Sequence, residues 1–172
     1  MTEVEIFPGY VAPRGLGTIP HEDVAHYTGL ELLRRVVEGE YPAPSIAARM
    51  NFGLVEVDEG RVVFQGMPGA RHFNPLGSVH GGWAATVLDS ALGCCIHTLL
   101  DKGEGYSTVE MKVNYLRPIS DKTGVVTCEG KVVNKGRTLA VSEARMTDEN
   151  GKLLAIGTET CAIFPIGNLA AR

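Results

Sequence analysis

The chain has 172 residues, a formal net charge of −4 and 44% apolar residues. This length fits one domain whose core needs no disulfide or metal to hold it. The balance of apolar and charged residues excludes a disordered chain. No cluster of lysine and arginine is visible, which excludes a typical nucleic-acid-binding protein.

The first 48 residues are predicted to form an extension ahead of the main domain. Residues 1–20 hold three prolines and three glycines, a composition that predicts an irregular arm. The start of the chain lacks a basic region followed by an apolar one, so no signal peptide is expected. Thr28 and Glu31 have the spacing of a capping box, and apolar residues at helical spacing follow, which predicts a short helix near 29–38.

From residue 49 to about 165 the pattern is that of one α+β domain, followed by a short tail, 166–172. A long apolar segment predicts a helix that is apolar on nearly every side and must therefore be covered on nearly every side. Alternating apolar and polar residues predict six strands, which an antiparallel sheet wrapped around that helix would accommodate. The helix is expected at 82–101 and the strands at 49–57, 61–67, 106–117, 124–133, 137–147 and 152–164.

The apolar segment is better explained by a buried helix than by a membrane span. Its length is marginal for a span, and it contains Asp89 and His97. The four cysteines form neither a CxxC pair nor a metal-ligand spacing with histidine, so we expect reduced core thiols, no metal site and a cytoplasmic location.

The informative motif lies where a loop enters this helix. Asn74 is followed by the triplet His80, Gly81 and Gly82, and Asp89 comes nine residues after the histidine. This pattern resembles the PaaI-type branch of the hotdog acyl-CoA thioesterases, as do the later stretches 109–118 and 136–155. The resemblance covers about 49–165. It implies a hotdog fold and hydrolysis of acyl-CoA or aryl-acyl-CoA thioesters to a free acid and CoA, with no cofactor beyond the CoA of the substrate.

The two glycines offer a physical reason for this chemistry. The first N–H groups of a helix have no internal partner, and the helix dipole is positive at that end. A thioester carbonyl placed on such an N–H would be polarised as its oxygen gains charge. The resemblance implies this role for the N–H of Gly81; the alternative is that both glycines only permit close helix–sheet packing.

Asp89 is the only acidic residue between Gly82 and Leu100, and we expect it to be buried among apolar neighbours. Burial would raise its pKa towards the range that suits a general base near neutral pH. Asp89 could activate a water or attack the thioester itself to form a mixed anhydride. The alternative is a structural aspartate that holds a backbone or hydroxyl group.

The spacing of the two candidate groups predicts a shared active site. Eight helical residues separate Gly81 from Asp89, or roughly 12 Å along the axis, whereas both groups must approach one carbon. Two antiparallel copies of the helix would bring Gly81 of one subunit to Asp89 of the other. We therefore expect a homodimer, and the resemblance implies a dimer of dimers.

Further candidates support these two residues. The resemblance places Asn74 near the carbonyl or the attacking water and gives Thr108 a water-orienting role. Their alternatives are a turn residue and an ordinary strand threonine. His80 could donate to the substrate or shape the loop. Candidate contacts to CoA and its acyl group are Gly82, Trp83, Arg117, Lys135, Gly136, Arg137 and Thr138. The alternatives are a core position for Trp83, which we slightly favour, and a solvated hairpin turn for 135–137.

Two other functions compete with thioester hydrolysis. One is a hotdog dehydratase acting on a β-hydroxyacyl thioester. The other is a non-catalytic module that binds acyl-CoA. We expect neither a nucleic-acid nor a membrane partner.

Overall fold

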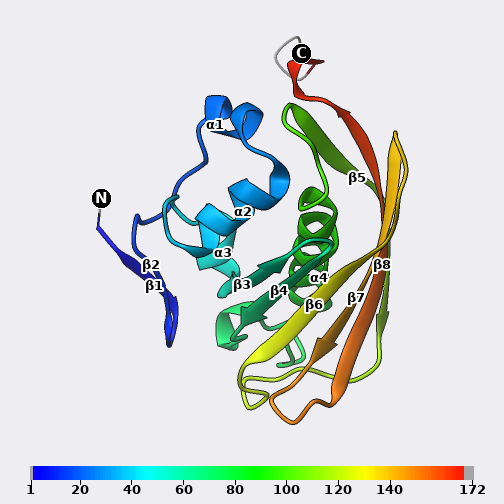
Figure 1. The fold of residues 1–172 in the computed structure, drawn as a ribbon. Coiled ribbons are helices and arrows are strands. Elements are labelled where there is room, and N and C mark those ends of the chain that lie inside the picture. The colour runs from blue at the N-terminus through cyan, green and yellow to red at the C-terminus, as the bar shows by residue number, and fades with distance from the viewer. Residues whose placement is uncertain (1, 169–172) are drawn as a thin grey trace.

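The computed structural model describes residues 2–168 and consists of a curled six-stranded sheet, a central helix and an N-terminal extension (Figure 1). The helices are α1 (His21–His26), α2 (Gly29–Val37), α3 (Ser45–Met50) and α4 (Gly81–His97), with short 3-10 turns at Ala70–His72 and Ile166–Asn168. The strands are β1 (Val4–Phe7), β2 (Tyr10–Ala12), β3 (Phe52–Asp58), β4 (Arg61–Gly66), β5 (Glu104–Tyr115), β6 (Val126–Lys135), β7 (Leu139–Thr147) and β8 (Leu153–Pro165).

The large sheet is antiparallel throughout, in the order β3-β4-β6-β7-β8-β5. It wraps around α4, and this confirms the predicted architecture of a sheet curled around one long helix (Figure 1). All six predicted strands and the central helix are present. The helix ends at His97 rather than at residue 101, since Leu99 and Leu100 close it with tighter backbone bonds to Ile96 and His97.

The contact between α4 and β6 is made by backbone atoms. A Cβ built on Gly130 of β6 would lie 2.3 Å from the carbonyl oxygen of Ala91, so only glycine lets the helix approach this closely. Nine residues of α4 are buried, and they form the middle of the main core: Trp83, Ala84, Val87, Leu88, Ala91, Leu92, Gly93, Cys95 and Ile96.

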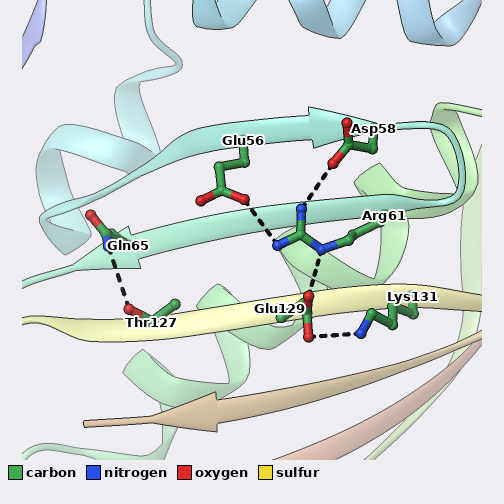
Figure 2. Close-up of polar contacts among 7 residues, drawn as sticks. All are labelled: Glu56, Asp58, Arg61, Gln65, Thr127, Glu129 and Lys131. Carbon is green, nitrogen blue, oxygen red and sulfur yellow. Dashed lines mark hydrogen bonds and ion pairs between the residues drawn. The ribbon is translucent and has the colours of Figure 1, made fainter. Parts of the chain in front are cut away.

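The outer face of the sheet is polar. Figure 2 shows Arg61 on β4 reaching three carboxylates, those of Glu56, Asp58 and Glu129. Lys131 pairs with the other oxygen of Glu129 at 3.0 Å. Because one face carries this ion-pair network and the other covers α4, the alternation along these strands fixes which side chains face inward.

The N-terminal extension is more regular than predicted. The expected irregular arm, residues 1–20, contains the hairpin β1–β2, because residues 4–7 and 10–12 pair across a turn at Gly9 (φ +88°). Helix α1 follows directly at His21–His26, where the sequence predicted no helix. The expected strand at 49–57 begins only at Phe52. Residues 45–50 form α3, which ends at Asn51 in the left-handed conformation (φ 51°).

Helix α2 attaches the extension to the end of α4. Its capping box forms as predicted, with Thr28 and Glu31 bonding to each other's backbone N–H. The Gly29 N–H donates to the carbonyl of Leu100 at 3.0 Å, and a Cβ on Gly29 would lie 1.7 Å from the carbonyl oxygen of His97. Of the predicted tail, 166–168 form a 3-10 turn, and 169–172 lie outside the described residues.

Candidate active site

The N-terminus of α4 presents a backbone donor to a surface cavity. The His80 imidazole caps the helix, its Nδ1 accepting from the Gly82 N–H at 2.8 Å. The Gly81 N–H, by contrast, has no hydrogen-bond partner among residues 2–168. A free N–H at a helix N-terminus is the group expected to stabilise an oxyanion.

The cavity beside Gly81 has a volume of about 340 Å³, and its lining includes His80, Gly81, Tyr115 and Arg117. The Tyr115 hydroxyl donates to the Gly81 carbonyl at 3.2 Å, which holds the peptide that joins Gly81 to Gly82. Because His80 Nδ1 accepts, its neutral ring carries the proton on Nε2. The loop-shaping role of His80 is therefore present in the structure, and a donor remains available on the same ring.

Asp89 lies two turns further along α4 and is exposed in the protomer. The expectation that apolar neighbours bury this aspartate is wrong. The apolar side of α4 faces the middle of the sheet, whereas Asp89 points towards β5, the strand at the open edge of the sheet. The Thr108 hydroxyl of β5 lies 3.4 Å from Asp89 Oδ1, so the structure brings these two candidate residues together.

The buried acid of the site is Glu159 on β8, which the sequence interpretation missed. Glu159 is 1% exposed, and its Oε1 lies 3.0 Å from the same Thr108 hydroxyl. Cys161 donates to that oxygen at 2.9 Å, while Oε2 has no partner among the described residues. Burial, and the nearby Asp89 carboxylate, raise the pKa of Glu159 to about 7.

A β-bulge in β5 lets one strand serve both parts of the site. Thr108 pairs with Cys161 and Glu110 with Thr160, so Val109 is an extra residue with no partner on β8. The bulge shifts the alternation by one. As a result, Thr108 faces Asp89 and Tyr115, seven residues on, faces Gly81, although an odd spacing would put them on opposite faces of a regular strand.

Two predicted site residues have structural roles in the protomer. Asn74 forms a turn: its Oδ1 accepts from the N–H groups of Leu76 and Ser78, and its Nδ2 donates to the Ser78 hydroxyl. Trp83 is 1% exposed, and its indole N–H donates to the carbonyl of Met50 at 2.6 Å. In the protomer the ring of Trp83 is enclosed in the core, which is the structural alternative to a substrate contact.

The candidate CoA contacts lie at two separate ends of β5. Arg117 follows β5 near Gly81 and donates to the carbonyl of Leu153. Lys135 lies at the other end, 3.7 Å from Glu104. The rest of that group, Gly136, Arg137 and Thr138, forms the turn between β6 and β7. Within one protomer these two ends of β5 are eleven residues apart, a distance of roughly 36 Å along the strand.

A second, apolar cavity of about 470 Å³ lies between the extension and the hotdog domain. Ser90 and Cys94 line it from α4, and Phe52 and Phe64 line it from the sheet. The extension supplies the opposite wall through residues of β2, α2 and α3. Ser90 is the neighbour of Asp89, so this cavity adjoins the turn of α4 that carries the candidate acid.

The cysteines are free, and three of the four, Cys95, Cys128 and Cys161, are buried. Cys94 is partly buried. No helix within residues 2–168 has the length and apolar character to cross a membrane. The absence of a cofactor stays a prediction.

Fold and site together define a hotdog-fold thioester hydrolase. The family model described as the thioesterase superfamily matches residues 76–155, from the loop before α4 to the start of β8. Human acyl-coenzyme A thioesterase 13 is 30% identical over 112 residues, which cover 62% of this chain and 76% of that protein. The chain therefore belongs to the thioesterase superfamily.

Solved structures agree with this assignment. A hypothetical thioesterase protein with coenzyme A from Streptococcus pneumoniae is 26% identical, with a TM-score of 0.61 over 67% of this chain and 90% of that one. PaaI from the phenylacetic acid degradation operon of Escherichia coli shares the fold, with a TM-score of 0.68 at 18% identity over 82% of this chain and 96% of that one.

Proposed function

We propose that the chain hydrolyses acyl-CoA thioesters, with Asp89 as the general base and the Gly81 N–H as the oxyanion donor. The observation that carries this proposal is the unpartnered Gly81 N–H at the N-terminus of α4, on the helix that also holds Asp89 beside Thr108. A water oxygen adds to the thioester carbon while Asp89 takes its proton. The carbonyl oxygen becomes an oxyanion at the Gly81 N–H. Collapse then breaks the C–S bond, and the proton passes to the sulfur of CoA.

We further propose that each site is shared by two protomers. Gly81 and Asp89 lie roughly 12 Å apart along one helix, too far for one carbon to reach both. The strand β5 has 12 residues and pairs only with β8 among the described strands, and its Val109 is 63% exposed. An exposed edge strand of this length is a natural pairing surface for a second copy.

Antiparallel pairing of two β5 edges would also join the separated CoA contacts. The start of one β5 would then lie beside the end of the other. The turn with Lys135 and Arg137 of one protomer would come close to Arg117 and Gly81 of its partner, and together these cations would hold the CoA phosphates. Pairing of two such dimers into a tetramer is part of the same proposal.

The apolar cavity favours a substrate whose acyl group is uncharged. CoA itself is anionic and polar, so of the substrate only the acyl part suits a space lined by Phe52, Phe64 and Leu33. The free thiols support a reducing compartment, and we keep the cytoplasm as the proposed location.

The first test is the release of thiol from a panel of acyl-CoA and aryl-acyl-CoA substrates. We expect turnover by the wild-type chain and a fall in kcat of about 10²–10⁴-fold in Asp89→Asn, with an unchanged melting temperature because Asp89 is exposed. Thiol release separates hydrolysis from dehydration and from binding alone. Normal turnover by Asp89→Asn would contradict the assigned base.

The shared site is tested by light scattering and by mixing variants. Val109→Lys should weaken the dimer, and Val133→Lys, an equally exposed valine on β6, is its control. Heterodimers of Asp89→Asn with a Gly81→Val variant should regain activity, because one of their two sites carries both native groups. Confirmed subunit exchange without any recovery would refute sharing.

The acyl cavity is tested by narrowing it. Val36→Phe should lower kcat/KM for long acyl chains more than for acetyl-CoA, because Val36 lines the cavity. Val133→Phe is the control for an added ring on an exposed surface. An equal effect on all chain lengths would place the acyl group elsewhere.

A further inference from the structure

Glu159 is a buried acid that the reaction as proposed does not use. It is 1% exposed, in the middle of β8, and its neighbour opposite on β7 is Ser142, whose buried hydroxyl also has no partner among the described residues. A buried carboxylate without a cation is costly. No lysine, arginine or histidine donates to Glu159 among residues 2–168, so the structure supplies no charge to balance an ionised form.

The Thr108 hydroxyl lies between Glu159 and Asp89. It is 3.0 Å from Glu159 Oε1 and 3.4 Å from Asp89 Oδ1. A hydroxyl has one proton to donate. If both acids were ionised, they would compete for that proton, and Thr108 could satisfy only one of them.

We propose that Glu159 is a positioning residue for Asp89: protonated Glu159 donates to Thr108 Oγ1, and this commits the Thr108 proton to Asp89 Oδ1. The inference rests on the proposed function of Asp89. The resulting chain runs from Glu159 through Thr108 to Asp89 and holds one carboxylate oxygen of Asp89, which leaves Oδ2 free to accept the proton of the attacking water.

The surroundings of Glu159 favour its protonated form. The titratable groups that face it are Asp89, Cys94 and Cys95 on α4, Tyr106 on β5 and Cys161 on β8. None of them is a cation at neutral pH. Burial, the largest cause, and the Asp89 carboxylate both raise the pKa of Glu159, to about 7.

This arrangement predicts the pH dependence of turnover. Asp89 must be ionised and Glu159 protonated, so kcat should fall as the pH rises through about 7. The loss should be about tenfold, the equivalent of one hydrogen bond. In Glu159→Gln the amide N–H donates to Thr108 at every pH, so kcat should stay within about threefold of the wild type at pH 6 and should not fall above pH 7.

Thr108 variants show whether the effect passes through the hydroxyl. Thr108→Ser should keep the decline in kcat above pH 7. Thr108→Val should lower kcat about tenfold and remove that decline. Glu143→Gln is the matched control, because it makes the same change on the exposed face of β7. A decline above pH 7 that persists in Glu159→Gln or in Thr108→Val would overturn the inference.

Failure of the proposed function is distinguishable from failure of this inference. A wild-type chain that releases no thiol from any acyl-CoA would refute the function, and the inference with it. Infrared difference spectra of the wild type against Glu159→Gln need no turnover, and they keep the Asp89 carboxylate that helps to raise the pKa of Glu159. A carboxylic-acid C=O band of Glu159 at pH 6 that disappears by pH 8 supports the protonated acid, and a carboxylate already present at pH 6 refutes it.

Discussion

Replacing Glu159 by glutamine should make the protein more stable at alkaline pH. The fold raises the pKa of this acid from its ordinary 4.5 to about 7, because burial disfavours the charged form. Between these two values the unfolded chain has released the proton while the folded chain still holds it. The free energy of unfolding of the wild type therefore falls as the pH rises from 4.5 to 7, and the loss is complete above the folded value.

The size of this loss follows from the shift. Each pKa unit corresponds to about 1.4 kcal/mol, so the wild type should lose about 3 kcal/mol between pH 4.5 and pH 8 through Glu159. Glutamine has nearly the same shape and cannot ionise. The difference in unfolding free energy between Glu159→Gln and the wild type should therefore grow by about that amount over the same range, in favour of the variant.

Urea denaturation at fixed protein concentration measures this directly. Midpoints and slopes are compared at pH 5 and pH 8 for the wild type, Glu159→Gln and the exposed control Glu143→Gln. The control should follow the wild type. Parallel curves for the wild type and Glu159→Gln would refute the reasoning, because they would show that the folded state does not disfavour the Glu159 carboxylate.

Three further substitutions test other features of the structure. Tyr115→Phe removes the hydrogen bond to the Gly81 carbonyl and should lower kcat/KM several-fold in the thiol-release assay, with little change in melting temperature because Tyr115 is 55% exposed. Gly130→Ala should destabilise the fold by more than about 2 kcal/mol in urea, because its Cβ would lie 2.3 Å from the Ala91 carbonyl oxygen. Thr28→Ala breaks the capping box of α2 and should cost about 1 kcal/mol by the same measurement, whereas an unchanged midpoint would show that α2 docking does not need the cap.

The sequence was sufficient for the fold of the main domain because its patterns are strong. The alternation in six segments and the apolar character of 82–97 both reflect which side chains are buried. The structure has the six strands and the helix that these patterns predict. The extension was harder to predict. Its strands β1 and β2 have four and three residues, too short for alternation to stand out among the prolines and glycines.

The candidate site was predicted in part for a similar reason. Gly81 and Asp89 lie on one helix, and the spacing of residues in the sequence is enough to predict their separation along it. Asp89 and Glu159 meet at Thr108 only because β5 pairs with β8. Thr108 and Glu159 are 51 residues apart in the sequence, so the spacing of residues cannot reveal this contact. One signal was available: Gly157, Glu159, Cys161 and Ile163 alternate along β8 as inward positions, and a glutamate in such a series is anomalous.

The wrong expectation about the burial of Asp89 has one cause. Asp89 was judged by the apolar segment around it, whereas burial depends on which side of α4 a residue occupies. Trp83 turns towards Met50 and the core, and Asp89 turns towards the open edge of the sheet at β5.

Because Val109 has no partner on β8, strand β5 should be sensitive to a change in its length. Deleting it would restore regular alternation, and one half of β5 would then rotate by half a turn relative to the other. Either Thr108, which lies next to Asp89, or Tyr115, which lies next to the N-terminus of α4, would then point to the other side of the sheet. The two halves of the site thus depend on an exact residue count between them, so a loss or gain of one residue here would be far more damaging than most substitutions.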